Sequence, residues 1–316
     1  MSKLRPLIAV TLCLVVFSST SQAWFGFGHM AVAYVAYQKL TPEKKTRVAT
    51  LLKKNPYYNT KWKALIPAGT PSDQRDLMLF MIAATWPDEI KSDSKYVNDG
   101  TSGGNRPPSG PTAWQNSGYG DLNRHKYWHF IDTPFTQDGT SPLSAIPSPN
   151  AETEIAIFRQ TLTSNSSDKL KSYDLVWLLH LVGDVHQPLH SSTRVGAADL
   201  EGDNGGNNVK LAAPSSELHA FWDGLPGDSS NIADVITYGK TLTAADPLLA
   251  KKADASDWIK ESFDIAQTTV YSTPIGTNDG PFTITPAYKT KAQTIAAERV
   301  ELAGERLANL INDELK

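Results

Sequence analysis

The sequence predicts a mainly α-helical fold with no more β-structure than a small hairpin. Three observations support this prediction: apolar residues recur at helical spacing, helix start signals are frequent, and the apolar/polar alternation of half-buried strands is nearly absent. The clearest helical stripe lies in residues 286–315, where the apolar side consists of Ile295, Val300, Leu302, Leu307, Leu310 and Ile311. No internal repeat of fixed period is present.

The predicted helices can be placed in order. Residues 28–40 are small and apolar, and Thr41 followed by Pro42 is a typical cap and first turn for a helix over 41–54. Residues 72–84 begin with acidic side chains and continue with an apolar face. Similar patterns predict further helices at 150–163, 167–187, 216–225, 232–240, 255–271 and 286–315.

Two stretches rich in Gly, Pro, Asn and Ser separate these helices, at residues 92–120 and 191–216. Loops of this length in a compact domain are usually functional. Residues 202–208 form a glycine-rich turn signal, which predicts a small hairpin closing before residues 209–211.

Residues 1–23 have the three regions of a secretory signal peptide: Lys3 and Arg5, an apolar run over 7–17, and a small-residue end at Ala23. The run is shorter than the roughly 20 residues that span a bilayer. We therefore expect cleavage after Ala23, release of residues 24–316 as one domain, and a secreted or periplasmic location. The single cysteine, Cys13, lies in the leader, so neither a disulfide nor a thiolate ligand is expected in the exported chain.

The formal net charge is −3, and removal of the two cationic leader residues makes it more negative. Proteins that neutralise many phosphates need clustered Lys and Arg. The charge therefore excludes a polycationic nucleic-acid binder, and any phosphate substrate must be attracted by cations at the site itself.

Residues 180–190 carry three histidines and an aspartate. His180 and Asp184 are four residues apart, which places them on one face of a helix. Pro188 should end that helix, so His190 is free to point toward a different ion. The cluster indicates a metal site, with a buried polar helix end as the alternative.

The same spacing recurs at His219 and Asp223. Asp88 follows a Trp-Pro bend, and His29 lies five residues after Trp24, the expected new N-terminus. Sets of two histidines and one carboxylate with an open position are typical of catalytic zinc. The full set of candidate side chains is His29, Asp88, His129, His180, Asp184, His190, His219 and Asp223.

The order and spacing of these motifs, together with Gly202-Asp-x-Gly-Gly-Asn207, resemble the zinc-dependent type I single-strand nuclease family, the nuclease P-one/S-one family. The resemblance covers nearly all of residues 24–316. It implies a multi-helix fold of the kind shared with zinc phospholipase C and three Zn²⁺ ions per chain. The lack of cysteines after the leader departs from fungal and plant members and favours a bacterial one.

The resemblance also implies the ligands of each ion. Carried over residue by residue, the first zinc would be held by Asp88, His129, His180 and Asp184. The second would be held by the amine and carbonyl of Trp24, by His29 and by Asp184, which would bridge the pair. The third would be held by His190, His219 and Asp223. His125 and His186 match no ligand; we expect His125 in a loop and His186 behind a ligand.

The chemistry implied by the resemblance is attack on phosphorus by a hydroxide between the bridged zincs, with Asp88 and Asp184 holding the pair and the third zinc neutralising the departing 3′ oxygen. Products would be 5′-phosphorylated nucleotides from single-stranded DNA and RNA, with 3′-nucleotidase activity as a further expectation. Lys91 matches a basic residue near the scissile phosphate; its alternative is a solvated lysine at a loop start.

Phe130 and Asp132 match family residues that stack on a nucleobase and hydrogen-bond to it, which would favour unstacked single strands. The alternative for Phe130 is a core aromatic. Asn207 is expected to order the glycine loop near the site. The expected partners are single-stranded nucleic acid and nucleotides; we expect no membrane, no obligate protein partner and a monomer.

Two other functions compete with this one. A zinc phospholipase C would cleave lipid head-group phosphodiesters at a similar site, but its last ligand is typically Glu, whereas here it is Asp223. A non-enzymatic zinc-binding protein would need every metal position filled by protein. Three carboxylates and a free N-terminus are too few to close three sites around five histidines.

Overall fold

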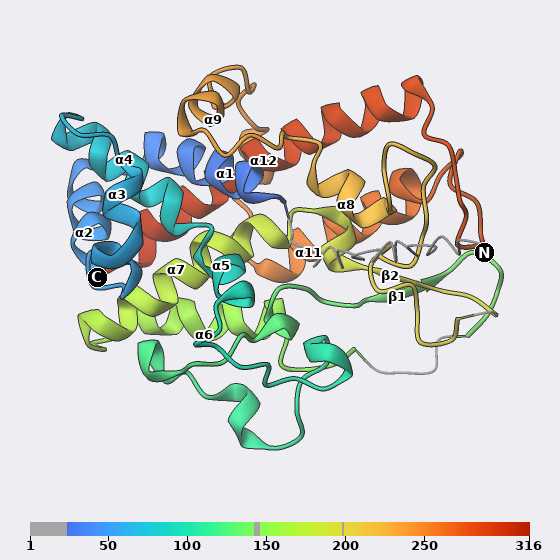
Figure 1. Ribbon diagram of the computed structural model, residues 1–316, viewed down its shortest axis with the longest axis horizontal. Helices are drawn as coiled ribbons and strands as arrows, with labels where there is room; N and C mark the ends of the chain where they lie inside the picture. Colours follow the sequence, from blue (N-terminus) through green and yellow to red (C-terminus); the bar gives the residue numbers. More distant parts are fainter. Residues whose placement is uncertain (1–23, 142–145, 198) are drawn as a thin grey trace, which may run out of the picture.

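The computed structural model describes residues 24–141, 146–197 and 199–316, and it confirms a mainly helical fold (Figure 1). The predicted signal peptide, residues 1–23, lies outside the described residues. The α-helices are α1 (Gly26–Lys39), α2 (Pro42–Leu52), α3 (Lys63–Leu65), α4 (Ser72–Ala83), α5 (Trp86–Ser92), α6 (Ala151–Thr163), α7 (Asp168–Asp184), α8 (Leu218–Asp223), α9 (Ile232–Gly239), α10 (Pro247–Ala250), α11 (Ala255–Ile265) and α12 (Pro286–Glu314).

Shorter turns complete the helical structure. Two are π-helical, at Tyr58–Trp62 and at Ala266–Val270, where the latter continues α11. The 3₁₀ turns are Ser102–Gly104, Pro111–Trp114, Gly118–Gly120, Lys126–Trp128 and Pro188–Ser191. Over the described residues, no helix is both long enough and apolar enough to cross a bilayer.

Helix starts follow the capping signals in the sequence. The Thr41 hydroxyl accepts a hydrogen bond from Lys44 N, with Pro42 in the first turn of α2. Asn150 and Thr153 form a reciprocal capping box at the start of α6. The Trp-Pro pair at 86–87, expected to be a bend, instead begins α5, because a first-turn proline lacks only an N–H that has no helical partner.

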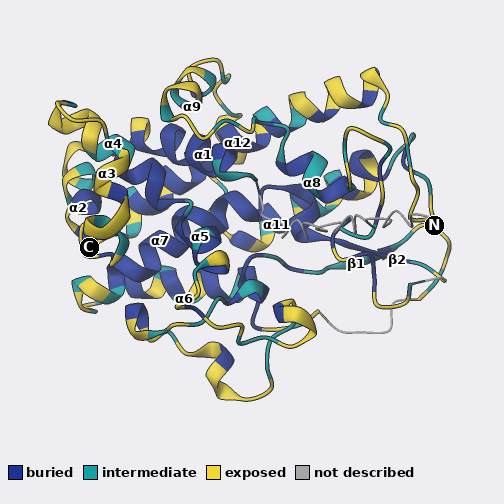
Figure 2. Ribbon diagram, viewed as in Figure 1, coloured by how far each residue is buried: buried dark blue, intermediate teal, exposed yellow. Residues whose placement is uncertain are grey.

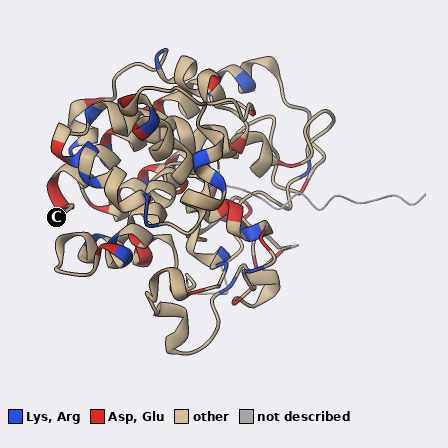
Figure 3. Ribbon diagram, turned by 60° about the vertical axis from the view of Figure 1, so that its left-hand side comes forward, with Lys and Arg blue, Asp and Glu red and all other residues tan. Residues whose placement is uncertain are grey.

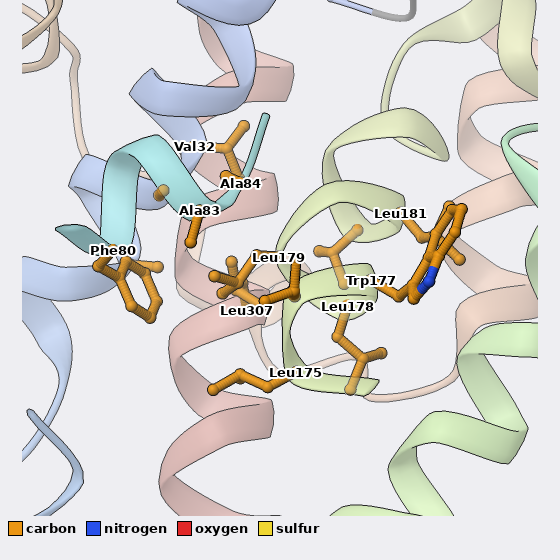
Figure 4. Packing of buried hydrophobic residues seen from close by; sticks show 14 of the residues in the cluster. Val32, Phe80, Ala83, Ala84, Leu175, Trp177, Leu178, Leu179, Leu181 and Leu307 are labelled. Atoms are coloured by element: carbon orange, nitrogen blue, oxygen red, sulfur yellow. The ribbon is translucent and has the colours of Figure 1, made fainter. Parts of the chain in front are cut away.

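Helix α7 lies at the centre of the core, and Figure 4 shows its leucines directed toward neighbouring helices. Every residue of α7 from Lys171 to Asp184 is buried, and the helix packs against α6, α12, α2 and α5. Figure 2 shows the same buried interior continuing through α1 and α12. Because the last turns of α7 carry His180 and Asp184, this burial places both side chains inside the protein.

The small sheet differs from the predicted hairpin. Its two strands, β1 (Pro134–Thr136) and β2 (Thr193–Val195), are parallel, with Phe135 opposite Arg194. The glycine-rich turn at 202–208 joins no hairpin strands; residues 210 and 211 form only isolated bridges, to Glu217 and Phe282. The prediction failed because local turn chemistry cannot reveal pairing between segments some sixty residues apart. The parallel pairing places the segment that follows His129 beside the segment that follows His190.

Charged side chains are spread over the molecule, with Lys and Arg interspersed among Asp and Glu in the view of Figure 3. Many of these charges form surface ion pairs, such as Lys39 with Glu305 and Arg159 with Glu314. This distribution agrees with the small negative net charge of the chain.

A buried acid on α6 makes the stability of the fold depend on pH. Glu154 is 1% exposed, and neither carboxylate oxygen has a hydrogen-bond partner within the described residues. Burial raises its pKa from 4.5 to about 8. Between these values the folded chain binds a proton that the unfolded chain has released, so stability falls as pH rises through this window. One pKa unit corresponds to about 1.4 kcal/mol, so the shift from 4.5 to about 8 lowers the free energy of unfolding by roughly 5 kcal/mol across this window.

We therefore expect Glu154→Gln to remove most of this pH-dependent loss. Urea unfolding at pH 5 and pH 8.5 measures the effect, because the free energy of unfolding should fall less between the two pH values in the variant than in the wild type. Glu152→Gln, on the same helix but half-buried, is the control. An identical pH dependence in wild type and Glu154→Gln would contradict the expectation.

Candidate metal centre

One group of candidate ligands forms around the end of α7. Asp184 is fully buried, and its two carboxylate oxygens face different imidazoles. Oδ1 lies 3.3 Å from His29 Nε2 of α1. Oδ2 lies 3.0 Å from His129 Nδ1 and 3.3 Å from His180 Nε2. A carboxylate placed in this way is able to contact two ions at once.

Asp88 of α5 lies close to the same imidazoles. Its Oδ1 lies 3.6 Å from His180 Nε2, and its Oδ2 lies 4.0 Å from His29 Nε2. The ammonium of Lys91, one helical turn later, lies 2.7 Å from Asp88 Oδ1 and is 6% exposed. The alternative of a solvated lysine at a loop start is therefore wrong, because Lys91 is buried on a helix beside the ligand group.

A second group contains His190, His219 and Asp223. Helix α7 ends at Asp184, earlier than the predicted end at residue 187, because Val185 already caps it. Pro188 begins a 3₁₀ turn, and His190 belongs to a different ligand group from His180, as expected. His190 Nε2 lies 3.0 Å from His219 Nε2, and His219 Nε2 lies 3.4 Å from Asp223 Oδ2. His219 and Asp223 are four residues apart on α8 and share one face of it.

Backbone carbonyls fix which nitrogen of three histidines carries the proton. His180 Nδ1 donates to Ala84 O, His190 Nδ1 to His129 O, and His219 Nδ1 to Gly205 O, at 2.6 to 2.8 Å. Since a carbonyl oxygen only accepts, each neutral ring presents a lone pair at Nε2. His190 and His219 therefore direct two lone pairs at each other across 3.0 Å, with no proton to share. A cation between them resolves this arrangement.

Burial shifts the pKa values of the ligand groups so that the histidine rings stay neutral and the aspartates tend to be protonated when no cation is bound. It lowers the pKa of His180 and His190 well below the usual value and lowers that of His219 to about 4. It raises the pKa of Asp184, which the neighbouring Asp88 raises further, and it also raises the pKa of Asp223. Asp223 Oδ2 and His129 Nε2 have no hydrogen-bond partner within the described residues. This buried set of imidazole and carboxylate donors fits divalent zinc.

Two residues that the sequence did not single out hold ligands in place. Gln187 donates from Nε2 to Asp223 Oδ1 at 2.7 Å and accepts from Leu189 N through Oε1. Asp203 accepts from Gly206 N and from the Tyr271 hydroxyl, which anchors the glycine loop. Such outer hydrogen bonds orient ligands. Both stand inside the sequence motifs, Gln187 directly before Pro188 and Asp203 within the glycine turn.

The glycine loop reaches His219 only because it contains glycine at position 205. Gly205 has φ +60°, and a Cβ there would lie 2.5 Å from Leu189 O. The carbonyl of this residue accepts from His219 Nδ1. In the same loop, Asn207 donates to Asn204 O at 2.7 Å, so it orders the loop beside the site.

Trp24 lies against the first ligand group. Its side chain is fully buried, and its Nε1 donates to Gly183 O at 3.0 Å. Gly28 and Gly183 leave room for this approach: a Cβ at Gly28 would lie 2.7 Å from Trp24 Cβ, and one at Gly183 would lie 3.0 Å from His29 Nδ1. The backbone of the next residue, Phe25, donates to Asp223 O. The start of the described chain is thus held between the two ligand groups.

A cavity of about 350 Å³ adjoins both groups, and it is lined by Lys91, Lys126, His129, Phe130, Asp132, His190, Asn207 and His219 among others. Phe130 is partly exposed to this cavity, so the core-aromatic alternative is wrong. Desolvation raises the pKa of Asp132 to about 7, opposed by the nearby Arg106. The cavity therefore combines an aromatic ring, an acid and cations next to the candidate ligands.

The two remaining histidines lie elsewhere. His125 is buried, stacks on Trp128 at 3.5 Å between ring centroids, and bonds Asp99 and Asp121. Although burial opposes it, these two carboxylates raise the pKa of His125. The expectation that His186 lies behind a ligand is wrong: its Nδ1 donates to Val182 O, and its Nε2 accepts from Arg306. The helical turn after Asp184 directs His186 toward α12 instead.

Comparison with known proteins identifies the family of this chain. The family model described as S1/P1 Nuclease matches residues 24–316. Nuclease S1 of Aspergillus oryzae is 23% identical over 337 residues, covering 98% of this chain and 96% of that protein. Endonuclease 3 of Arabidopsis thaliana is 26% identical over 232 residues, covering 70% of this chain and 60% of that protein. The chain, a helical protein with buried His/Asp groups able to bind metal, is a nuclease that belongs to the S1/P1 nuclease family.

Proposed function

We propose that this protein is a zinc-dependent phosphodiesterase that hydrolyses single-stranded DNA and RNA to 5′-phosphorylated nucleotides and removes the phosphate from nucleoside 3′-phosphates. The observation that carries the proposal is the shared cavity: both ligand groups adjoin it, and Phe130 and Asp132 lie in its wall. A site able to place a phosphate among metal ligands and a base against an aromatic ring suits an unpaired nucleotide.

In this proposal the chain holds three Zn²⁺ ions. Asp88, His129, His180 and Asp184 would hold one; Trp24, His29 and Asp184 the second; His190, His219 and Asp223 the third. Three donor groups in the structure support three ions, although not every proposed ligand set matches one group: His29, Asp88 and His180; His129, His180 and Asp184; His190, His219 and Asp223. When bound, zinc supplies Lewis-acid activation of water and neutralises charge on phosphate oxygens.

The side chains of the protein perform the positioning. Asp184 and Asp88 hold imidazoles of α1 and α7 at distances suited to a shared pair of ions. Lys91 provides a charge-assisted hydrogen bond to a non-bridging phosphate oxygen, because it lines the cavity and lies beside Asp88. Phe130 stacks on the base, and Asp132 accepts from a base N–H. A base in a duplex would have to leave its stack to reach them.

Export also remains part of the proposal. Residues 1–23 would be removed, so that the amine of Trp24 becomes free beside the ligand group formed by His29 and Asp184. The buried position of Trp24 and its bond to Gly183 support this role.

A direct assay tests the proposed function. Purified protein starting at Trp24 is incubated with single-stranded DNA, RNA, a nucleoside 3′-phosphate and phosphatidylcholine vesicles. We expect nucleotides that carry 5′-phosphate, release of phosphate from the 3′-nucleotide, and loss of both activities with a zinc chelator. Cleavage of lipid without release of nucleotides would favour the phospholipase C alternative and overturn the proposal.

A further inference from the structure

The cavity beside the ligand groups contains a second lysine to which the proposed function gives no role. Lys126 lines this cavity together with Lys91, His129 and Phe130. It lies three residues before His129, in the 3₁₀ turn Lys126–Trp128 that delivers this ligand. Its ammonium group therefore belongs to the segment that also carries the base-stacking ring.

The side chain of Lys126 contacts the loop that contains Gly103 and Gly104. Its Nζ donates to Gly103 O at 3.2 Å. Its stem packs against Gly104, where a Cβ would lie 2.9 Å from Lys126 Cδ. Both glycines have positive φ, 69° and 101°, which other residues rarely adopt. A Cβ at position 104 would lie closest to Asn98, 2.2 Å from its Oδ1, so glycine is required there and Lys126 packs against the loop that results.

The backbone at Lys126 is fixed as well. The preceding residue, His125, has left-handed φ of 44° and is clamped between Asp99 and Asp121. The following residue, Tyr127, donates to Asp99 at 2.6 Å. Long, flexible lysines usually lose entropy when they bind an anion. Here the fixed backbone on both sides of Lys126 and the bond of its Nζ to Gly103 O reduce part of that cost.

The charge of Lys126 is not compensated by the protein. Lys91 pairs with Asp88 at 2.7 Å, and Arg106 pairs with Glu201 at 3.0 Å. Within residues 24–141, 146–197 and 199–316, Lys126 forms no ion pair with a carboxylate. Burial, together with the nearby Lys91 and Arg124, lowers its pKa. An ordered cation that faces a substrate cavity without a counter-ion is suited to bind an anionic group of the substrate.

We propose that Lys126 binds the phosphate on the 5′ side of the nucleoside whose base contacts Phe130 and Asp132. This inference rests on the proposed function, which places the scissile phosphate on the 3′ side of the same nucleoside, at the ligand groups and Lys91. Each internal nucleoside of a strand carries one phosphate on either side. Lys91 and Lys126 thus contact consecutive phosphates, and the enzyme prefers a nucleotide within a strand to one with a free 5′ hydroxyl.

Two small substrates that differ in one phosphate test this assignment. The kcat/KM for phosphate release is measured on a nucleoside 3′-phosphate and on the corresponding 3′,5′-bisphosphate, for wild type, Lys126→Gln and Lys126→Arg. We expect wild type to prefer the bisphosphate, Lys126→Gln to reduce this preference about tenfold, and Lys126→Arg to retain most of it. Lys260→Gln, an exposed lysine of α11 outside the cavity, should alter neither value.

A salt titration gives an independent readout on a single-stranded oligonucleotide. The slope of log KM against log salt should become shallower by about 0.7 in Lys126→Gln, the amount expected for one lost phosphate contact. Equal losses on both small substrates, or an unchanged preference, would overturn the role of Lys126 while leaving the proposed function intact. Wild-type protein that hydrolyses neither substrate would overturn the proposed function and this inference with it.

Discussion

Asp184→Asn is expected to abolish nuclease activity, with a loss on the order of 10³-fold or more in kcat/KM. The two oxygens of Asp184 face His29 on one side and His129 with His180 on the other. An amide retains the shape but loses the charge, and its NH₂ cannot act as a ligand. The variant should therefore lose up to two of the three proposed zinc ions. Zinc content by atomic emission and nucleotide release from single-stranded DNA measure the two effects.

Helix α7 provides a matched control for this substitution. Asp174 is also an aspartate of α7 with no exposed surface, and it accepts from Asn116 rather than from any candidate ligand. Asp174→Asn should keep zinc and activity near wild-type values. If Asp184→Asn retained full zinc and full activity, the assignment of this carboxylate as a bridging ligand would be wrong.

Adding one alanine before Trp24 is expected to remove one zinc ion and to reduce activity by about 100-fold or more. This is at least the loss expected when a residue that orients a metal ligand is mutated. The reason is that an added residue converts the terminal amine of Trp24 into an amide, which cannot coordinate through nitrogen in its neutral form. The indole of Trp24 would still bond Gly183, so the fold should persist. Zinc content, activity and the circular dichroism spectrum distinguish these effects.

The control for this experiment is recovery of zinc content and activity. Removal of the extra alanine by an aminopeptidase should restore zinc and activity in the same sample, whereas a chain extended after Lys316 should keep both. Equal zinc and equal activity in the extended and native chains would rule out the Trp24 amine as a ligand. The 3′-nucleotide and single-stranded DNA should respond together, because both use the same ions.

Much of the fold could be predicted from local signals. Thr41 and Asn150 begin α2 and α6 because capping depends on the few residues at a helix start. The same kind of signal was misread at Trp86-Pro87, where a first-turn proline permits a helix as readily as a bend. The parallel pairing of β1 with β2 could not be predicted, because it depends on how distant segments meet around α7.

The candidate site was predictable where spacing within one helix sufficed, as for His180 with Asp184 and His219 with Asp223. Residues that contact a ligand rather than the metal itself were harder to predict from the sequence. Gln187 reaches Asp223 across thirty-six positions, and His186 faces Arg306 rather than a ligand. His186 lies only two positions from Asp184 and still points away from the ligand groups, so closeness in sequence does not establish closeness in space.

The bond from His190 Nδ1 to His129 O is paired with a second one, from Ile131 N to His190 O. The first of these bonds joins a side chain to the main chain, and the second joins main chain to main chain. Together they tie His190 of one ligand group to the segment that carries His129 of the other, so the spacing between the groups is fixed partly by the backbone itself. Under the proposed function, a phosphodiester bound between the two groups would meet the same spacing whatever base precedes or follows it.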